Sequence, residues 1–142
     1  MKIDKYAPII PYVEMGKIKL YSSISELSEI IANSNENILN DLWVRYDINN
    51  LLSLFFHRKN CKLFKITTMS GYCGCLFDKI NVNTFENDIA LLDDSFEYDD
   101  FEEVWESKKG VFIEVDPCTR KSTWITVYIK EMDDDDFDNG EW

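Results

Sequence analysis

Three consecutive strand-like runs constrain the fold of this chain most strongly. In the first run, residues 42–48, every second side chain is large and apolar, which is the spacing of residues on one face of a β-strand. The second and third runs, 51–56 and 63–68, are rich in aromatic and branched side chains. Short turn-forming segments at 49–50 and 58–60 separate the runs. Because short turns connect antiparallel neighbours, the sequence predicts an antiparallel meander.

A similar arrangement occurs in the second half of the chain. A short strand at 18–21, a helix that begins with a Ser23–Glu26 capping box and a polar loop at 33–37 are predicted before the meander. The corresponding predicted segments of the second half are a strand at 80–82, a helix with apolar positions Phe85, Ile89 and Leu92, and strands at 111–115 and 123–129. The offset stays near 60 residues, which predicts a weak internal duplication of a strand–helix–strands unit. Low identity between the halves leaves coincidence as the alternative.

We therefore expect an α+β fold, with an antiparallel sheet of five or six strands and two short helices on one face. The 142 residues suffice for one domain with a single core, which we assign to residues 1–130. Residues 131–142 then form an acidic C-terminal tail, which we expect to be mobile.

The net charge of −12 is concentrated in two stretches that contain no Lys or Arg. Residues 93–106 hold eight carboxylates and residues 131–142 hold seven, which leaves 12 acidic residues against 15 basic ones elsewhere. This charge balance argues against nucleic acid or an anionic membrane as the main partner, because both attract cations. It favours a basic protein as the partner.

The first acidic stretch also carries four aromatic residues, a combination that is typical of protein interfaces. We predict that this stretch is the main contact, with Phe101 and Trp105 as anchors, and that the tail is an auxiliary clamp. The predicted partner-binding residues are Asp93, Asp94, Glu97, Tyr98, Asp99, Asp100, Phe101, Glu102, Glu103, Trp105, Glu106, Asp133, Asp134, Asp135 and Asp136. The alternative for Phe101 and Trp105 is that they pack a short helix onto the core. The stretch itself is either a loop or an edge strand protected by its charges.

Few residues of this chain indicate catalysis or metal binding. The only histidine, His57, lies beside two basic residues, and no glycine-rich phosphate loop occurs. His57 with Cys61, Cys73 and Cys75 has poor spacing for zinc, and residues 133–141 lack the pattern of an EF-hand. We expect no catalytic residue, no metal and no cofactor. The absence of an export signal or an apolar membrane-spanning run predicts a cytoplasmic protein with reduced thiols.

Three stretches of the sequence suggest a family. They are residues 71–80 (GYCGCLFDKI), 109–116 (KGVFIEVD) and 124–129 (WITVYI), with a helix after the first and the acidic stretch before the second. In this order the chain resembles small bacterial immunity proteins of contact-dependent growth inhibition and related polymorphic toxin systems. The duplicated layout is similar to that of β-lactamase inhibitor protein. The resemblance implies a basic toxin domain as partner, of RNase or DNase type, whose cleft an acidic inhibitor can fill.

We therefore expect a non-enzymatic, cytoplasmic immunity protein that binds and neutralises its cognate toxin and makes no direct contact with nucleic acid or membrane. The first alternative is an acidic adaptor or chaperone-like module for a basic protein unrelated to toxins. An enzyme whose site is assembled from tyrosine and carboxylate residues is the second alternative.

Overall fold

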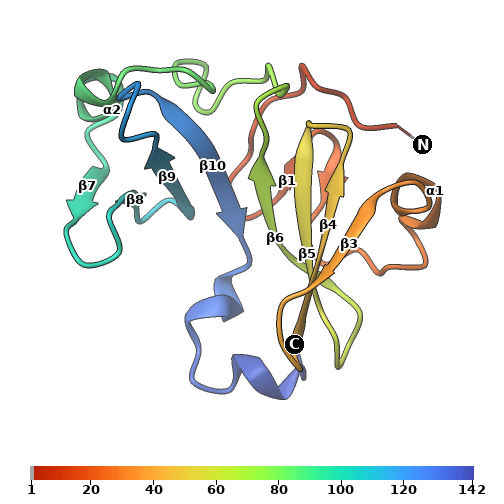
Figure 1. Ribbon diagram of the computed structural model, residues 1–142. Coiled ribbons are helices and arrows are strands. Elements are labelled where there is room, and N and C mark those ends of the chain that lie inside the picture. Colours follow the sequence, from red (N-terminus) through yellow and green to blue (C-terminus); the bar gives the residue numbers. More distant parts are fainter. Residues whose placement is uncertain (1) are drawn as a thin grey trace.

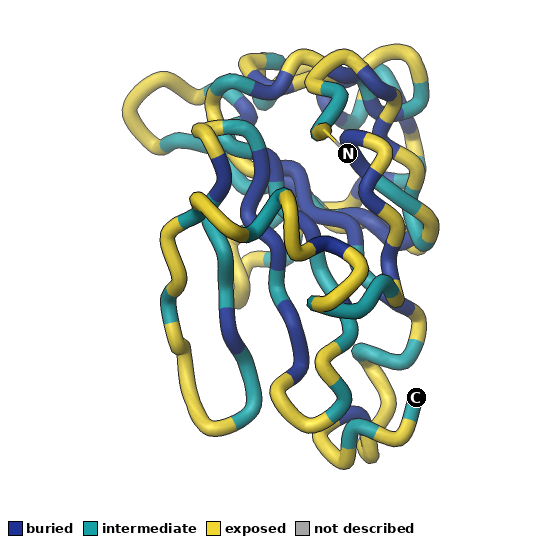
Figure 2. The backbone as a smooth tube through the Cα atoms, turned by 90° about the vertical axis from the view of Figure 1, so that its right-hand side faces the viewer, coloured by how far each residue is buried: buried dark blue, intermediate teal, exposed yellow. Residues whose placement is uncertain are grey.

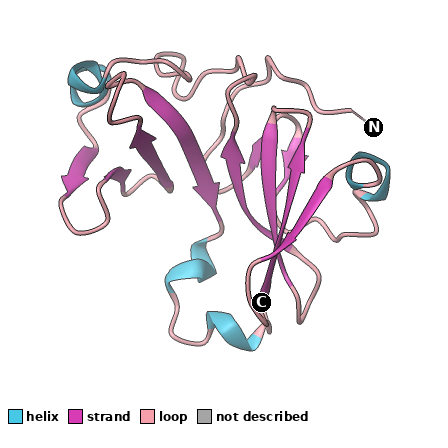
Figure 3. Cartoon of the chain, viewed as in Figure 1, coloured by secondary structure: helices cyan, strands magenta, loops and turns pink. Residues whose placement is uncertain are grey.

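The computed structural model describes residues 2–142 and consists mainly of β-strands (Figure 1, Figure 3). A two-stranded sheet is formed by β1 (Glu14–Met15) and β2 (Ile18–Lys19), and a large sheet has the order β3-β4-β5-β6-β10-β9-β8-β7. Neighbours in both sheets pair antiparallel. The strands of the large sheet are β3 (Asn35–Ile38), β4 (Trp43–Ile48), β5 (Leu52–His57), β6 (Leu63–Thr68), β7 (Phe96–Asp99), β8 (Val104–Ser107), β9 (Val111–Val115) and β10 (Ser122–Tyr128).

The prediction of five or six strands with two short helices is wrong. The large sheet has eight strands, and α2 (Glu86–Leu92) is the one helix longer than a single turn among residues 2–142. The other helical segments are α1 (Ser28–Ile31) and two 3₁₀ turns, η1 (Lys130–Asp133) and η2 (Phe137–Asn139). The fold is therefore mostly sheet.

Two segments explain much of this error. The predicted polar loop at 33–37 overlaps β3, whose pairing with β4 is supported by side-chain hydrogen bonds from Tyr46 to Glu36 (2.8 Å) and from Asn37 to Asp47 (3.2 Å). The capping-box contacts between Ser23 and Glu26 do form. However, the backbone of residues 23–24 is bound to the β5–β6 hairpin, so the continuous helix begins only at residue 28.

The two halves of the chain contribute corresponding elements to the large sheet and its helices. The first half runs α1-β3-β4-β5-β6 and the second runs α2-β7-β8-β9-β10. The halves meet at their last strands, β6 and β10, while β3 and β7 are the outermost strands (Figure 1). The strand predicted at 80–82 does not form, since Ile80 makes only an isolated bridge to Leu76. The repeated unit is thus a helix followed by four strands.

One face of the large sheet forms the core with the helices, the N-terminal segment and the connection between β6 and α2. Ile66 of β6 pairs with Leu54 on one side and Val127 on the other, and all three side chains are fully buried. Figure 2 shows the buried segments gathered in the central strands and the exposed ones along the turns. In β4 the predicted alternation does mark the more buried face, where Val44 and Ile48 lie, whereas β5 is buried on both faces.

Replacement of Leu52 by Ala is expected to lower the free energy of unfolding by about 2–5 kcal/mol, because this β5 side chain is fully buried and its loss leaves a cavity. The matched control is Leu91→Ala in α2, where the side chain is 83% exposed and the change should stay within about 0.5 kcal/mol. Urea unfolding of both variants measures the difference. Equal losses would contradict this assignment of the core.

Candidate binding surface

The first acidic stretch forms the outer hairpin of the large sheet. Asp93 follows α2 directly, β7 and β8 form the two arms, and residues 100–103 connect them. β7 is an edge strand, and its charged residues protect the edge from pairing with another chain. Of the alternatives predicted for this stretch, the edge strand is the one that forms.

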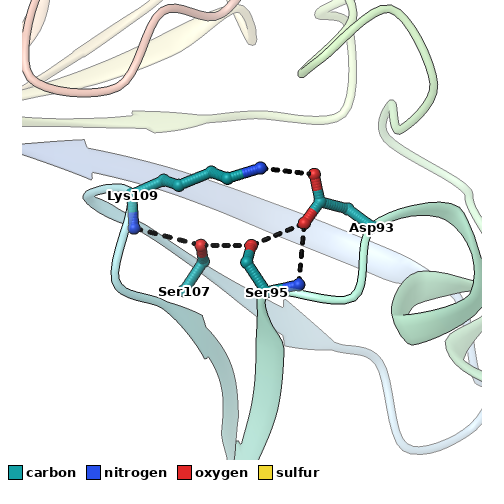
Figure 4. Close-up of polar contacts among 4 residues, drawn as sticks. All are labelled: Asp93, Ser95, Ser107 and Lys109. Carbon is teal, nitrogen blue, oxygen red and sulfur yellow. Dashed lines mark hydrogen bonds and ion pairs between the residues drawn. The ribbon is translucent and has the colours of Figure 1, made fainter.

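Asp93 lies inside the protein and holds the base of the hairpin (Figure 4). Its Oδ1 accepts hydrogen bonds from the Ser95 backbone N–H (2.9 Å) and hydroxyl (2.5 Å), and its Oδ2 lies 3.0 Å from Lys109 Nζ. Ser95 Oγ is in turn 2.6 Å from Ser107 Oγ. Burial raises the pKa of Asp93, but the bonds from Ser95 and Lys109 together lower it below its ordinary value of 3.8. Asp93 thus positions the hairpin from within.

The hairpin tip presents exposed side chains on a fixed turn. Asp99 Oδ1 accepts the backbone N–H groups of Phe101 (2.9 Å) and Glu102 (3.1 Å), which closes the turn. Phe101 is 91% exposed, and Asp100, Glu102 and Glu103 are exposed beside it. The tip therefore offers one aromatic ring among three carboxylates.

Tyr98 and Trp105 lie on the helix side of the sheet. Their ring centroids are 5.2 Å apart, and Trp105 Nε1 donates to Glu86 of α2 at 3.0 Å. Phe101 and Trp105, predicted as a pair of anchors, therefore occupy different environments. Trp105 is partly buried against α2, whereas Phe101 is free at the tip.

The opposite face of the sheet, which we call the open face, carries Glu97 and Glu106 at its hairpin end. The registers pair Glu97 with Glu106, Glu106 with Phe112, and Phe112 with Thr126, so one row of side chains runs from β7 to β10. Asp94, Glu97, Glu106, Lys108 and Tyr128 are among the residues around a hollow of about 440 Å³ at this end. The hollow is lined by three carboxylates and one ammonium group.

The second acidic stretch lies in a segment that follows β10 and folds back on the protein, which we call the strap, residues 130–142 (Figure 1). Phe137 is buried, and its ring stacks on Trp142 at 5.3 Å and packs against Phe64 at 5.2 Å. Asp133, Asp134, Asp135 and Asp136 are all exposed. The aromatic residues of the strap therefore hold its carboxylates at the protein surface.

Charges from both acidic stretches act on Tyr128, the last residue of β10. Burial raises the pKa of Tyr128 to about 12, and the charges of Asp133 in the strap and Glu106 in β8 both contribute to the rise. The Tyr128 ring also lies 5.9 Å from Phe112 and 6.1 Å from Tyr12. A small aromatic group around Tyr128 thus lies within the electrostatic influence of Glu106 from the first acidic stretch and Asp133 from the second.

A groove of about 310 Å³ continues along the open face over β4, β5, β6, β10 and β9. Trp124, 42% exposed, lines it with Phe55 and Phe112, and Lys65 Nζ lies 4.2 Å from the centroid of the Phe55 ring. Burial lowers the pKa of Lys65 and raises that of Glu114, and their opposite charges partly offset both shifts. The groove therefore combines three aromatic rings with two basic side chains, Arg45 and Lys65, and one carboxylate, Glu114.

None of the residues predicted from the sequence as partner-binding lines this groove. Strand periodicity places Phe112 with Glu114 and Trp124 with Thr126, but it does not reveal that β10 lies between β6 and β9. The pairing of distant strands creates the groove, and the sequence carries no local signal for that pairing.

Two further features bear on function. Within residues 2–142, no group of three or more His, Cys, Asp or Glu side chains is arranged to hold a metal ion. No helix in the same part of the chain combines the length and apolar character needed to cross a membrane.

The fold is similar to that of a cysteine-rich secretory protein from Staphylococcus aureus, known from a crystal structure, with a TM-score of 0.51 and 9% sequence identity. The match covers 92% of this chain and 49% of that protein, so the chain spans about half of its length. At this identity the similarity concerns the fold alone. No family model and no curated protein matches the sequence.

Replacement of Asp93 by Ala should lower the free energy of unfolding by about 1–3 kcal/mol at pH 7, because Ser95 and Lys109 lose a buried partner. The control, Asp94→Ala, removes an exposed carboxylate and should change it by less than about 0.5 kcal/mol. Since the folded-state pKa of Asp93 is lowered, its contribution is complete above pH 3.8 and is lost as the pH falls further. Denaturant unfolding at pH 7 and pH 3 should show the two variants converging in acid.

Proposed function

We propose that this chain is a bacterial immunity protein that binds a basic, nuclease-type toxin domain in the cytoplasm and neutralises it without catalysis. The observation that carries the proposal is the hollow on the open face where Asp94, Glu97 and Glu106 lie around Tyr128, with Asp133 of the strap adding negative charge that acts on the same tyrosine. The first acidic stretch thereby supplies the carboxylates of this surface, and one carboxylate of the second stretch adds to its negative potential. The alternative is an acidic adaptor for a basic protein unrelated to toxins.

Electrostatic attraction supplies the encounter between the two proteins. A surface of one sign raises the association rate of an oppositely charged partner by about 10- to 1000-fold over a neutral pair. Fast association suits an inhibitor that must capture its toxin before the toxin reaches nucleic acid. A nuclease cleft is basic because it binds phosphates, so an acidic surface can occupy the same place.

The open face supplies the contacts that retain the partner after the encounter. Trp124 and Phe112 offer apolar area beside the acidic end, and aromatic anchors contribute a large share of binding energy at protein interfaces. Phe101 offers a separate anchor at the hairpin tip. Binding in this way blocks the toxin by occupying its cleft and requires no chemical step.

Co-expression with the product of the adjacent upstream gene tests the proposal. We expect the two proteins to co-purify and growth to be rescued from that product's toxicity. A basic neighbour that binds tightly but is not toxic supports the adaptor instead, and the absence of binding rejects both.

Glu106→Lys is expected to slow association with the partner about 3- to 10-fold at low salt, with a smaller effect on dissociation, because it reverses a charge at the centre of the acidic surface. Asp41→Lys is the matched control, since Asp41 is exposed in the β3–β4 connection and the change in net charge is the same. Stopped-flow mixing over a range of salt concentrations measures both variants. Equal slowing would mean that net charge, not this surface, steers the encounter.

A further inference from the structure

His57 is the buried polar centre of the surface that the strap covers. Its side chain has no exposed area, and its ring lies 5.4 Å from Phe137, 5.6 Å from Trp142 and 6.4 Å from Phe64 between ring centroids. Trp43 of β4 also contacts Phe64 and Phe137. The strap thus closes an aromatic cage around the only histidine of the chain.

The two ring nitrogens of His57 differ. Nδ1 accepts the backbone N–H of Lys59 at 3.2 Å, whereas Nε2 is buried and has no hydrogen-bond partner among the described residues. The first bond requires Nδ1 without a proton, so Nε2 carries the hydrogen of the neutral ring. Protonation would break the Lys59 bond and place a charge in the aromatic cage, a cost that Asp138 offsets only in part.

The strap fits closely over this histidine. Gly140 has a φ of 66°, and a Cβ there would lie 2.8 Å from Lys59 Cβ and 3.3 Å from two atoms of the His57 ring. Polar contacts between the strap and the rest of the protein include Tyr21 to Glu131, Asn60 to the Gly140 (3.3 Å) and Trp142 (3.4 Å) carbonyls, and Lys62 to the Trp142 carbonyl (3.1 Å). The rings of Phe137 and Trp142 pack on His57 and Phe64 of the sheet, and His57 is the one titratable group among these rings.

We propose that the strap is a pH-sensitive latch, in which protonation of His57 releases residues 130–142 from the open face. Release uncovers Trp43 and Phe64, which adjoin the aromatic groove, since Lys65 lies 5.6 Å from the Trp43 ring and Phe55 6.4 Å from Phe64. It also removes Asp133 from the surroundings of Tyr128. The latch does not depend on the identity of the partner.

The charges that face His57 come from the strap and the β5–β6 hairpin. Burial lowers the pKa of His57 most, the Asp138 carboxylate and carbonyl raise it, and Lys59 lowers it, with a net fall below the ordinary value of 6.5. Packing of the strap on His57 therefore favours the neutral form of its ring. The stabilisation of the closed strap is complete above pH 6.5 and is lost as the pH falls through the lowered pKa of the folded form.

Hydrogen–deuterium exchange of the 130–142 peptide at pH 8 and pH 5 tests the latch. One proton is taken up on opening, so the fraction of open strap should rise by up to about tenfold per pH unit between the two pKa values. His57→Phe keeps an aromatic ring of similar size without a titrating group and should abolish this dependence. The native chain and His57→Phe are compared at each pH. Changes of pH that affect the chemical rate of exchange or the strap carboxylates act equally on both proteins and therefore drop out of the comparison.

A second measurement applies even where His57→Phe does not fold. The single histidine gives one imidazole signal in NMR, and Phe137→Ala should release the strap at every pH. We expect the pKa of His57 to lie below 6.5 in the native chain and to return toward 6.5 in Phe137→Ala. The same pKa in both proteins, or equal pH-dependent opening in the native chain and His57→Phe, overturns the proposal.

Discussion

The pairing of β6 with β10 is the contact on which the rest of the structure depends. These strands are about 60 residues apart in the chain, and each is the last strand of its half. Their register sets Ile66 against Val127 in the core and Thr67 against Thr126 on the open face, where the two hydroxyl oxygens are 2.8 Å apart. Closing so long a loop costs conformational entropy, which burial of the apolar row offsets. Eight strands then share one core instead of two marginal four-stranded sheets.

This pairing also separates the two faces of the sheet by function. One face takes up the apolar side chains with both helices, and the other keeps charged and aromatic residues accessible. β10 ends where the strap begins, so the register of β10 determines where Phe137 meets His57 and where Asp133 meets Tyr128. The acidic hairpin lies at the far edge, where β7 has no further neighbour and its carboxylates remain hydrated.

Segments of this chain differ in how clearly their amino-acid sequence indicates their structure. Residues 42–48 alternate in polarity, whereas 51–56 and 63–68 are rich in aromatic and branched side chains, and the three runs form β4, β5 and β6. β3 has no such pattern, since an edge strand with two asparagines takes its stability from the neighbouring strand. In the acidic stretch, Asp93 and Asp94 look alike in sequence, yet one is buried on Lys109 and the other is exposed. The path that the backbone takes after α2 turns Asp93 inward and Asp94 outward, and the sequence carries no local signal for this difference.

The sequence by itself determined the antiparallel character of the central strands, the concentration of negative charge and the aromatic residues mixed with it. These properties are local, because side-chain period and charge do not depend on distant contacts. Only the tertiary structure decided that the halves join through β6 and β10, that an aromatic groove forms between them, and that the second acidic stretch packs as a strap on His57. Those features come from pairings between residues far apart in the chain, whose register depends on the burial of the whole sheet.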